Sequence, residues 1–201
     1  MPSSFKLHDI VENATRRFAE VGIETPKVDA ELLVGFVLGL NRGQVQAEII
    51  RSTEIDEATA NRLTELFARR AKREPLQHIT GTAYFRNLEL SVGPGVFVPR
   101  PETEFVTQLA IDALKATSVA EPIAVDLGTG SGAIALAMAT EVANAQVFAV
   151  EKSDEAIGYT RKNFDRYGEK NANLIHGDLA DAFAELNGKV SVVISNPPYI
   201  P

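Results

Sequence analysis

The sequence predicts an α/β protein, in which a helical bundle and a short β-hairpin precede a doubly wound parallel sheet. Apolar residues in the first 75 positions recur at helical spacing. Residues 82–92 instead alternate between apolar and polar about Asn87. From residue 96 onward, short continuous apolar runs alternate with helical segments, a pattern typical of parallel strands that are covered on both faces.

Three helices are expected in the first part of the chain. The first carries apolar residues from Leu7 to Val21 and ends at Gly22, a residue that commonly terminates helices. The second repeats this pattern from Val28 and ends at Asn41, and the third begins near Asp56 and ends at Pro75. No residue of this bundle suggests catalysis.

The pattern of apolar residues changes from helical spacing to strand-like alternation between residues 76 and 95. The runs 82–86 and 88–92 read as two strands, and the sequence Gly-Pro-Gly at 93–95 ends the pattern. We therefore expect residues 76–95 to form a hairpin linker and residues 96–201 to form the third part of the protein.

In this third part a helix is expected to begin at Pro101, because proline is favoured in the first turn of a helix. Four buried strands are expected in order along the chain: 123–127, 146–150, 174–176 and 190–194. Their alternation with helices places the carboxyl ends of all four strands at one edge of the sheet.

Composition excludes several classes of site. The 201 residues include no cysteine, and the three histidines show no ligand spacing, so no metal site is expected. No signal peptide or membrane-spanning run is present, which makes the cytoplasm the default location and a membrane partner unexpected. Residues 76–201 carry 9 basic and 15 acidic residues, a net charge of −6 that disfavours nucleic acid as a direct partner.

The local basic cluster at residues 69–73 is expected to lie near a helix end. Cations at that position complement the helix dipole and are usually solvated.

A glycine loop follows the first expected strand of the sheet. Its residues are Gly128, Thr129, Gly130, Ser131 and Gly132. Glycines at these positions permit a tight turn and the close approach of a ligand. The spacing of the glycines also fits the fingerprint of dinucleotide-binding proteins, so the loop alone does not identify the cofactor. Glu151 lies where an acid that binds a ribose is expected, whether the cofactor is a dinucleotide or another nucleoside. The carboxylate of Asp126 favours a ligand that carries a positive charge.

The chain closes on Asn196, Pro197, Pro198 and Tyr199, directly after the fourth expected strand. The asparagine oxygen and the preset Pro197 carbonyl are two hydrogen-bond acceptors, and the tyrosine ring offers a flat stacking face. This combination suits a planar group that carries –NH₂, such as a carboxamide or the exocyclic amine of a base.

These motifs together resemble the class I S-adenosylmethionine-dependent methyltransferases that act on nitrogen, which have a Rossmann-like fold. The shared features are DLGTGSG at 126–132, the acid at 151, GD at 177–178 and NPPY at 196–199. FVPRPETE at 97–104, PLQHITGTAYF at 75–85 and the helical bundle are similar to the HemK/PrmC family. That family methylates a glutamine of peptide chain release factors.

The resemblance implies S-adenosyl-L-methionine as cofactor, S-adenosyl-L-homocysteine as product and release factors as protein partners. It implies that residues 128–132 contact the methionine part of the cofactor, that Glu151 holds the ribose, and that Asp126 also belongs to the cofactor site. It places Asp178 and Leu179 beside the adenine, although some members have an aromatic residue where Leu179 stands. Phe97 and Arg100 would lie over the site.

By the same resemblance, residues 196–199 would hold the glutamine side chain, with Asn196 also beside the cofactor. Residues 96–201 would form the S-adenosylmethionine-binding catalytic domain, and residues 1–75, which show no catalytic residue, are expected to recognise the protein substrate. Family members continue with further strands, so the second half of the sheet is expected to be absent from this sequence. Three alternatives stay open: a nucleic-acid amino-methyltransferase acting on adenine-N6 or guanine-N2, a non-catalytic cofactor-binding module, and a nicotinamide-dependent dehydrogenase.

Overall fold

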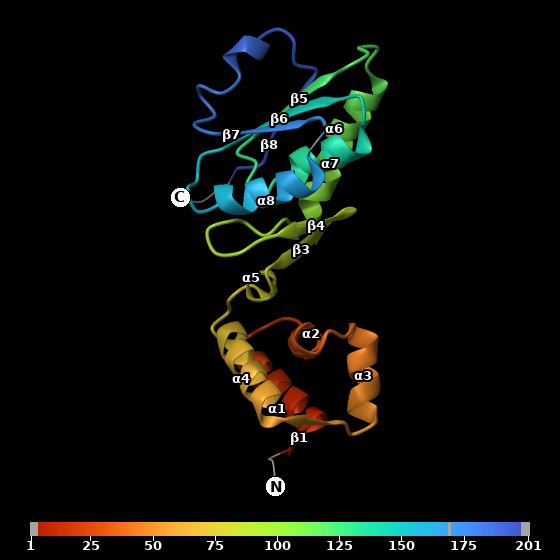
Figure 1. Ribbon diagram of the computed structural model, residues 1–201, viewed down its shortest axis with the longest axis vertical. Helices are drawn as coiled ribbons and strands as arrows, with labels where there is room; N and C mark the ends of the chain where they lie inside the picture. Colours follow the sequence, from red (N-terminus) through yellow and green to blue (C-terminus); the bar gives the residue numbers. More distant parts are fainter. Residues whose placement is uncertain (1–3, 169, 198–201) are drawn as a thin grey trace. The chain divides into compact units, whose positions relative to one another are not determined.

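The computed structural model describes residues 4–168 and 170–197. The chain forms two compact units, Met1–Thr80 and Gly81–Pro201, and each unit has its own apolar core (Figure 1). The mixed α/β fold expected from the sequence, with a helical N-terminal part followed by a parallel sheet, is confirmed.

The N-terminal unit is built from five helices and one small antiparallel sheet within its described residues. They are α1 (Leu7–Glu20), α2 (Pro26–Leu38), α3 (Arg42–Ile50), α4 (Glu57–Ala71), α5 (Leu76–Thr80), β1 (Ser4–Lys6) and β2 (Glu54–Asp56). Helix α1 is strongly amphipathic and buries Leu7, Val11, Ala14 and Phe18 in the core of this unit. The three helices expected in this part are therefore present as α1, α2 and α4.

Helix α3 was not predicted, because Asn41 was read only as the end of the preceding helix. Asn41 instead caps α3: its Oδ1 accepts a hydrogen bond from the Gln44 backbone N–H at 2.9 Å. The Gln44 side chain accepts one from the Asn41 N–H at 2.9 Å, which completes a capping box. One asparagine thus follows one helix and begins another.

The expected hairpin is present as β3 (Thr82–Phe85) and β4 (Leu88–Ser91), which pair antiparallel. Arg86, rather than Asn87, takes the left-handed conformation in the turn, with φ of 51°. The apolar side chains of the hairpin pack into the core of the second unit, so the structure groups it with the sheet. The functional division into residues 1–75, 76–95 and 96–201 stays a prediction.

The second unit contains a four-stranded parallel sheet with the strand order β7-β6-β5-β8. The strands are β5 (Ile123–Leu127), β6 (Gln146–Glu151), β7 (Ala172–His176) and β8 (Val192–Ser195). Each of them overlaps an expected strand. In the register, Leu127 lies opposite both Val150 and Ser195, so β5, β6 and β8 end side by side.

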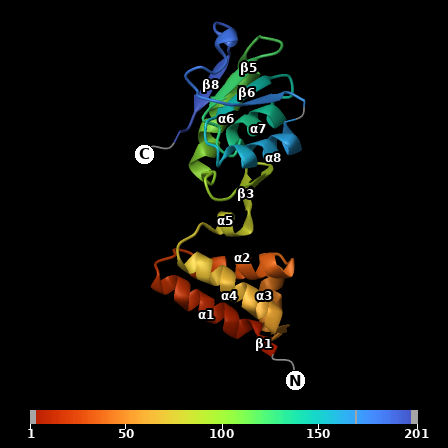
Figure 2. The same ribbon diagram turned by 60° about the vertical axis from the view of Figure 1, so that its left-hand side comes forward.

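The two faces of the sheet are covered differently. The helices α6 (Pro101–Ala116), α7 (Ala133–Glu141) and α8 (Ile157–Tyr167) share one core with one face, and both views show them on that side (Figures 1 and 2). The opposite face buries Val125 and Val150 against Phe183 and Leu186, around the short 3₁₀ helix η1 (Ala184–Leu186). In the described part of the chain, β8 is an edge strand, and Val193 in it is exposed.

Candidate functional site at the carboxyl edge of the sheet

Three of the predicted segments meet at one edge of the parallel sheet. The glycine loop follows β5, Glu151 ends β6, and Asn196 follows β8 directly. Because these strands are adjacent and parallel, the groups after them lie at the same edge, where ligands bind in open α/β sheets.

The glycine loop leaves open space above its first two glycines. Gly128, Gly130 and Gly132 have φ values of 76°, 58° and 84°, in the left-handed region that favours glycine. A Cβ added at Gly128 or Gly130 would have no other heavy atom within 4 Å, whereas one at Gly132 would lie 2.9 Å from the Phe164 ring. Gly132 is thus required by packing, and Gly128 and Gly130 border a surface that a ligand can approach.

The loop backbone is anchored to β6 and to helix α8. The amides of Gly128 and Thr129 both donate to the Val150 carbonyl at 3.0 Å. From α8, the Thr160 hydroxyl donates to the Gly130 carbonyl at 2.5 Å, and Asn163 Nδ2 donates to the Ser131 carbonyl at 2.8 Å. These contacts fix the conformation of the loop backbone.

Thr160 and Asn163 are buried positioning residues that the sequence analysis missed. Asn163 also accepts from the Ser91 amide at 2.7 Å and donates to the Ser91 carbonyl at 3.0 Å, which ties hairpin strand β4 to the loop. Their only sequence signal is their spacing, because both lie on the face of α8 that buries Ile157 and Phe164.

Glu151 is buried and its carboxylate is held by two backbone amides. Its Oε2 accepts from Gly130 N and its Oε1 accepts from Ser153 N, both at 2.7 Å. Only 8% of the residue is exposed, so the carboxylate has a fixed direction at the end of β6. Each oxygen retains a further lone pair for a hydroxyl donor.

Asp126 is fully buried beneath the loop. Its Oδ2 accepts from the Thr129 hydroxyl at 2.6 Å and from the Ala135 amide in the first turn of α7 at 3.2 Å. Its Oδ1 has no hydrogen-bond partner among the described residues. Burial raises the pKa of Asp126 to about 6, the two hydrogen bonds oppose that rise, and the charge of Glu151 adds to it.

Asn196 connects the end of β8 to the first turn of α6. Its Nδ2 donates to the Thr103 hydroxyl at 3.0 Å, which fixes the orientation of the side-chain amide. Thr103 lies inside the FVPRPETE stretch but was not singled out from the sequence. The contact joins two motifs that lie 93 residues apart. Pro197 is exposed, and Pro198 and Tyr199 lie outside the described residues.

The remaining predicted residues are less closely connected. Asp178 accepts from the Ala180 amide at 3.0 Å and from Lys152 Nζ at 2.8 Å, and these bonds lower its pKa. Leu179, Phe97 and Arg100 are exposed, and the structure shows no contact that assigns them a ligand.

No group of three or more His, Cys, Asp or Glu side chains in residues 4–168 and 170–197 has an arrangement that could hold a metal ion. In the same part of the chain, every helix is too short or too polar to cross a membrane.

Comparison with known protein families finds matches to both units. Residues 9–81 match the PrmC N-terminal domain, and residues 87–200 match the methyltransferase small domain.

Two curated relatives carry the description "release factor glutamine methyltransferase". The protein from Streptomyces coelicolor is 52% identical over 191 residues, which are 95% of this chain and 65% of the relative. The protein from Bifidobacterium longum is 44% identical over 204 residues, which are 96% of this chain and 69% of the relative. This chain therefore spans about two thirds of the length of these relatives.

Among solved structures, a SAM-dependent methyltransferase from Agrobacterium tumefaciens has a TM-score of 0.48 at 18% identity. The similarity covers 58% of this chain and 39% of that one, and it is too low to support an argument.

Proposed function

Since this chain belongs to the family of release factor glutamine methyltransferases, we propose that it methylates the side-chain amide nitrogen of a glutamine in a peptide chain release factor. The methyl donor is S-adenosyl-L-methionine, and the product is S-adenosyl-L-homocysteine. One observation carries the proposal: an open glycine loop, a fixed carboxylate and an oriented asparagine share one edge of the sheet. Because the substrate acts in translation termination, the proposed location is the cytoplasm.

The residues at this edge fit the methyl donor. When bound, the donor supplies an electrophilic methyl group on a positively charged sulfonium. The open space at Gly128 and Gly130 would take its methionine part, and Glu151 would accept from the ribose hydroxyls. Asp126 Oδ1, for which the described residues offer no hydrogen-bond partner, would favour a cationic ligand through its negative charge. Asp178, Leu179 and Phe97 are proposed to flank the rest of the donor.

Catalysis by this chain would consist mainly of placing the substrate amide. An amide nitrogen is a weak nucleophile, because its lone pair is shared with the carbonyl. Asn196 Oδ1 and the Pro197 carbonyl would accept the two amide hydrogens and favour positive charge on the nitrogen as it develops. After the methyl transfer, the nitrogen would release its surplus proton to solvent. Thr103 would hold Asn196 in the required orientation. Pro198 and Tyr199 are proposed to complete this cradle.

The competing substrate class is nucleic acid, since an exocyclic amine also suits two acceptors. The net charge of −6 on residues 76–201 disfavours it, because phosphate binding requires a basic channel. A labelled-methyl assay with release factor, DNA and RNA as separate substrates tests the proposal. Label on release factor alone supports it, and label on DNA or RNA alone would overturn it.

A further inference from the structure

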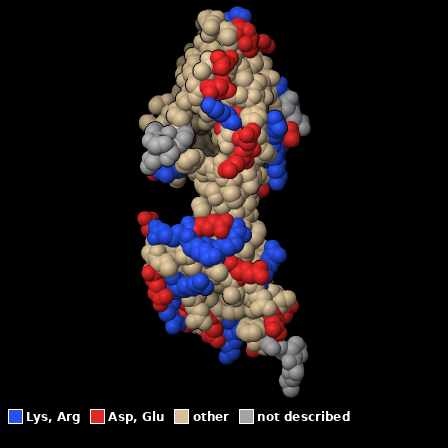
Figure 3. All heavy atoms as spheres, turned by 90° about the vertical axis from the view of Figure 1, so that its left-hand side faces the viewer, with Lys and Arg blue, Asp and Glu red and all other residues tan. Residues whose placement is uncertain are grey.

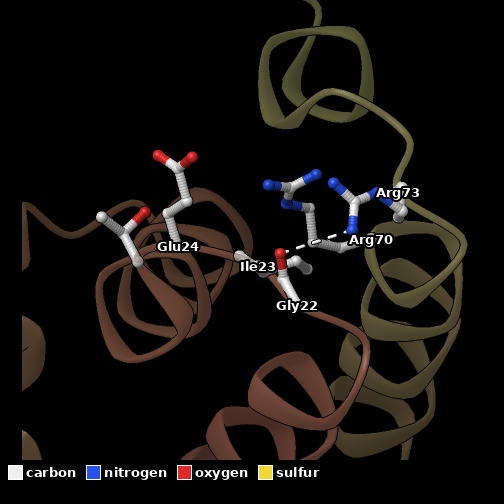
Figure 4. Close-up of a pocket in the computed structure, with 6 residues that line it drawn as sticks. Gly22, Ile23, Glu24, Arg70 and Arg73 are labelled. Atoms are coloured by element: carbon white, nitrogen blue, oxygen red, sulfur yellow. Dashed lines mark hydrogen bonds between the residues drawn. The ribbon is translucent and has the colours of Figure 1, made fainter.

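The N-terminal unit contains a pocket of about 220 Å³ that the proposed chemistry does not use. It lies between the turn that joins α1 to α2 and the end of α4, and Figure 4 shows its lining residues. They are Gly22, Ile23, Glu24, Thr25, Arg70 and Arg73. In the space-filling view, Lys and Arg side chains gather in a band on one face of this unit (Figure 3).

The two arginines of this pocket are held in place by fixed acceptors. Arg70 Nε donates to Asp29 Oδ2 at 2.7 Å, and its Nη1 donates to the Glu74 carbonyl at 2.8 Å. The Arg70 side chain is only 17% exposed, so the expectation that the whole basic cluster is solvated is wrong for this residue. Arg73 Nη1 donates to the Val21 carbonyl at 2.9 Å.

These contacts use only some of the N–H donors of the two guanidinium groups. A guanidinium has five N–H donors in a planar fork, and only some of them are used here. Within residues 4–168 and 170–197, no carboxylate lies within ion-pair distance of Arg73. Figure 4 shows the guanidinium groups of Arg70 and Arg73 side by side, with Glu24 across the pocket from them.

We propose that this pocket binds a carboxylate side chain of the protein substrate, an inference that rests on the proposed function. Two guanidinium groups with fixed orientations suit a planar carboxylate, which can accept two parallel hydrogen bonds. Asp29 already forms an ion pair with Arg70, so a bound carboxylate would pair mainly with Arg73.

A nucleic-acid phosphate is disfavoured as the occupant. Residues 1–75 contain 11 basic and 12 acidic residues, so this part of the chain has no general attraction for a polyanion.

The test compares steady-state methylation of release factor by the wild-type protein and by Arg73→Ala. We expect KM for release factor to rise about 10-fold, with kcat and S-adenosylmethionine affinity unchanged, because a charge-assisted hydrogen-bond site is lost. Arg73→Lys keeps the positive charge but not the planar pair of donors, so its KM for release factor should lie between those of the wild type and Arg73→Ala. The matched control is Arg62→Ala, which removes an exposed arginine of α4 and should leave KM unchanged.

Glu24→Gln provides a test in the opposite direction. This change removes a negative charge that lines the pocket and would repel an incoming carboxylate, so KM for release factor should fall several-fold, which loss of folding cannot mimic. Equal KM values for wild type, Arg73→Ala and Glu24→Gln would overturn the inference while leaving the proposed function intact. Weaker binding of an RNA oligonucleotide by Arg73→Ala, with unchanged KM for release factor, would also overturn it. If the wild-type protein transfers no methyl group to release factor, the proposed function is refuted, and so is the proposal that this pocket binds release factor.

Discussion

Replacing Asp126 by asparagine should change how the stability of the protein depends on pH. The carboxylate is fully buried, and its Oδ2 accepts from Thr129 and Ala135. An asparagine oxygen can accept the same two hydrogen bonds, so the variant keeps the local pairing. What it loses is the ionisable group whose pKa burial raises from 3.8 to about 6.

The sign and size of the effect follow from linkage. The folded pKa of Asp126 lies above the unfolded value, so the folded state binds the proton more tightly. The group therefore stabilises the fold fully below the unfolded pKa, and this stabilisation is lost as the pH rises through about 6. A rise of about 2 pKa units at 1.36 kcal/mol each amounts to ~3 kcal/mol.

The assay is urea-induced unfolding of the wild-type protein and Asp126→Asn at several pH values. The wild-type free energy of unfolding, minus that of the variant, should fall by ~2 to 3 kcal/mol between about pH 4 and about pH 7.5. Titrating groups that do not interact with Asp126 cancel in this difference. A difference that stays constant within ~0.5 kcal/mol across the range would refute the raised pKa and the reasoning from burial.

Three further changes have specific expected outcomes. Asn196→Ala should lower turnover on release factor on the order of 100- to 1000-fold while cofactor binding survives in calorimetry, and near-normal turnover would contradict the role of its oxygen as an acceptor. Gly130→Ala should cost ~1 kcal/mol of stability, because φ is 58°, and should weaken cofactor binding about 10-fold, because its Cβ enters the open space over the loop. Unchanged cofactor affinity would show that no ligand occupies that space. Arg86→Ala should lower the free energy of unfolding by ~2 kcal/mol, because Glu141, which accepts from Arg86 Nε at 2.6 Å and from its Nη2 at 2.7 Å, loses its partner. Calorimetry should show unchanged cofactor affinity for this variant, and unchanged stability in urea would contradict the assignment.

The helices and strands that could be predicted are those determined by residues within or next to the element. Strand β5 matches its expected range because a continuous apolar run ends at a glycine. Helix α6 begins at Pro101 because proline fixes φ in the first turn. Strands β1 and β2 were not predicted, because each has only three residues and their pairing joins Ser4 to Asp56. So short a strand carries no detectable alternation of its own.

In the candidate site, too, the features with a local cause could be predicted, and those that depend on residues distant in the sequence could not. The glycine loop, Glu151 and Asn196 could be assigned to one sheet edge, because parallel strands place their carboxyl ends together, and the structure brings them there. Thr103 and Thr160 could not, because each is a single polar residue on a helix whose partner is distant in the sequence. Neither the burial of Asp126 nor its unpartnered oxygen can be read from a short motif.

The central claim is that this edge holds a substrate amide beside a sulfonium donor. The most direct test is a structure of the protein with S-adenosylhomocysteine and a glutamine-containing release factor peptide. We predict that the glutamine –NH₂ donates to Asn196 Oδ1 and to the Pro197 carbonyl, with its nitrogen facing the sulfur over Gly128 and Gly130. A complex in which the glutamine lies away from Asn196, or in which the cofactor leaves the glycine loop empty, would contradict the account.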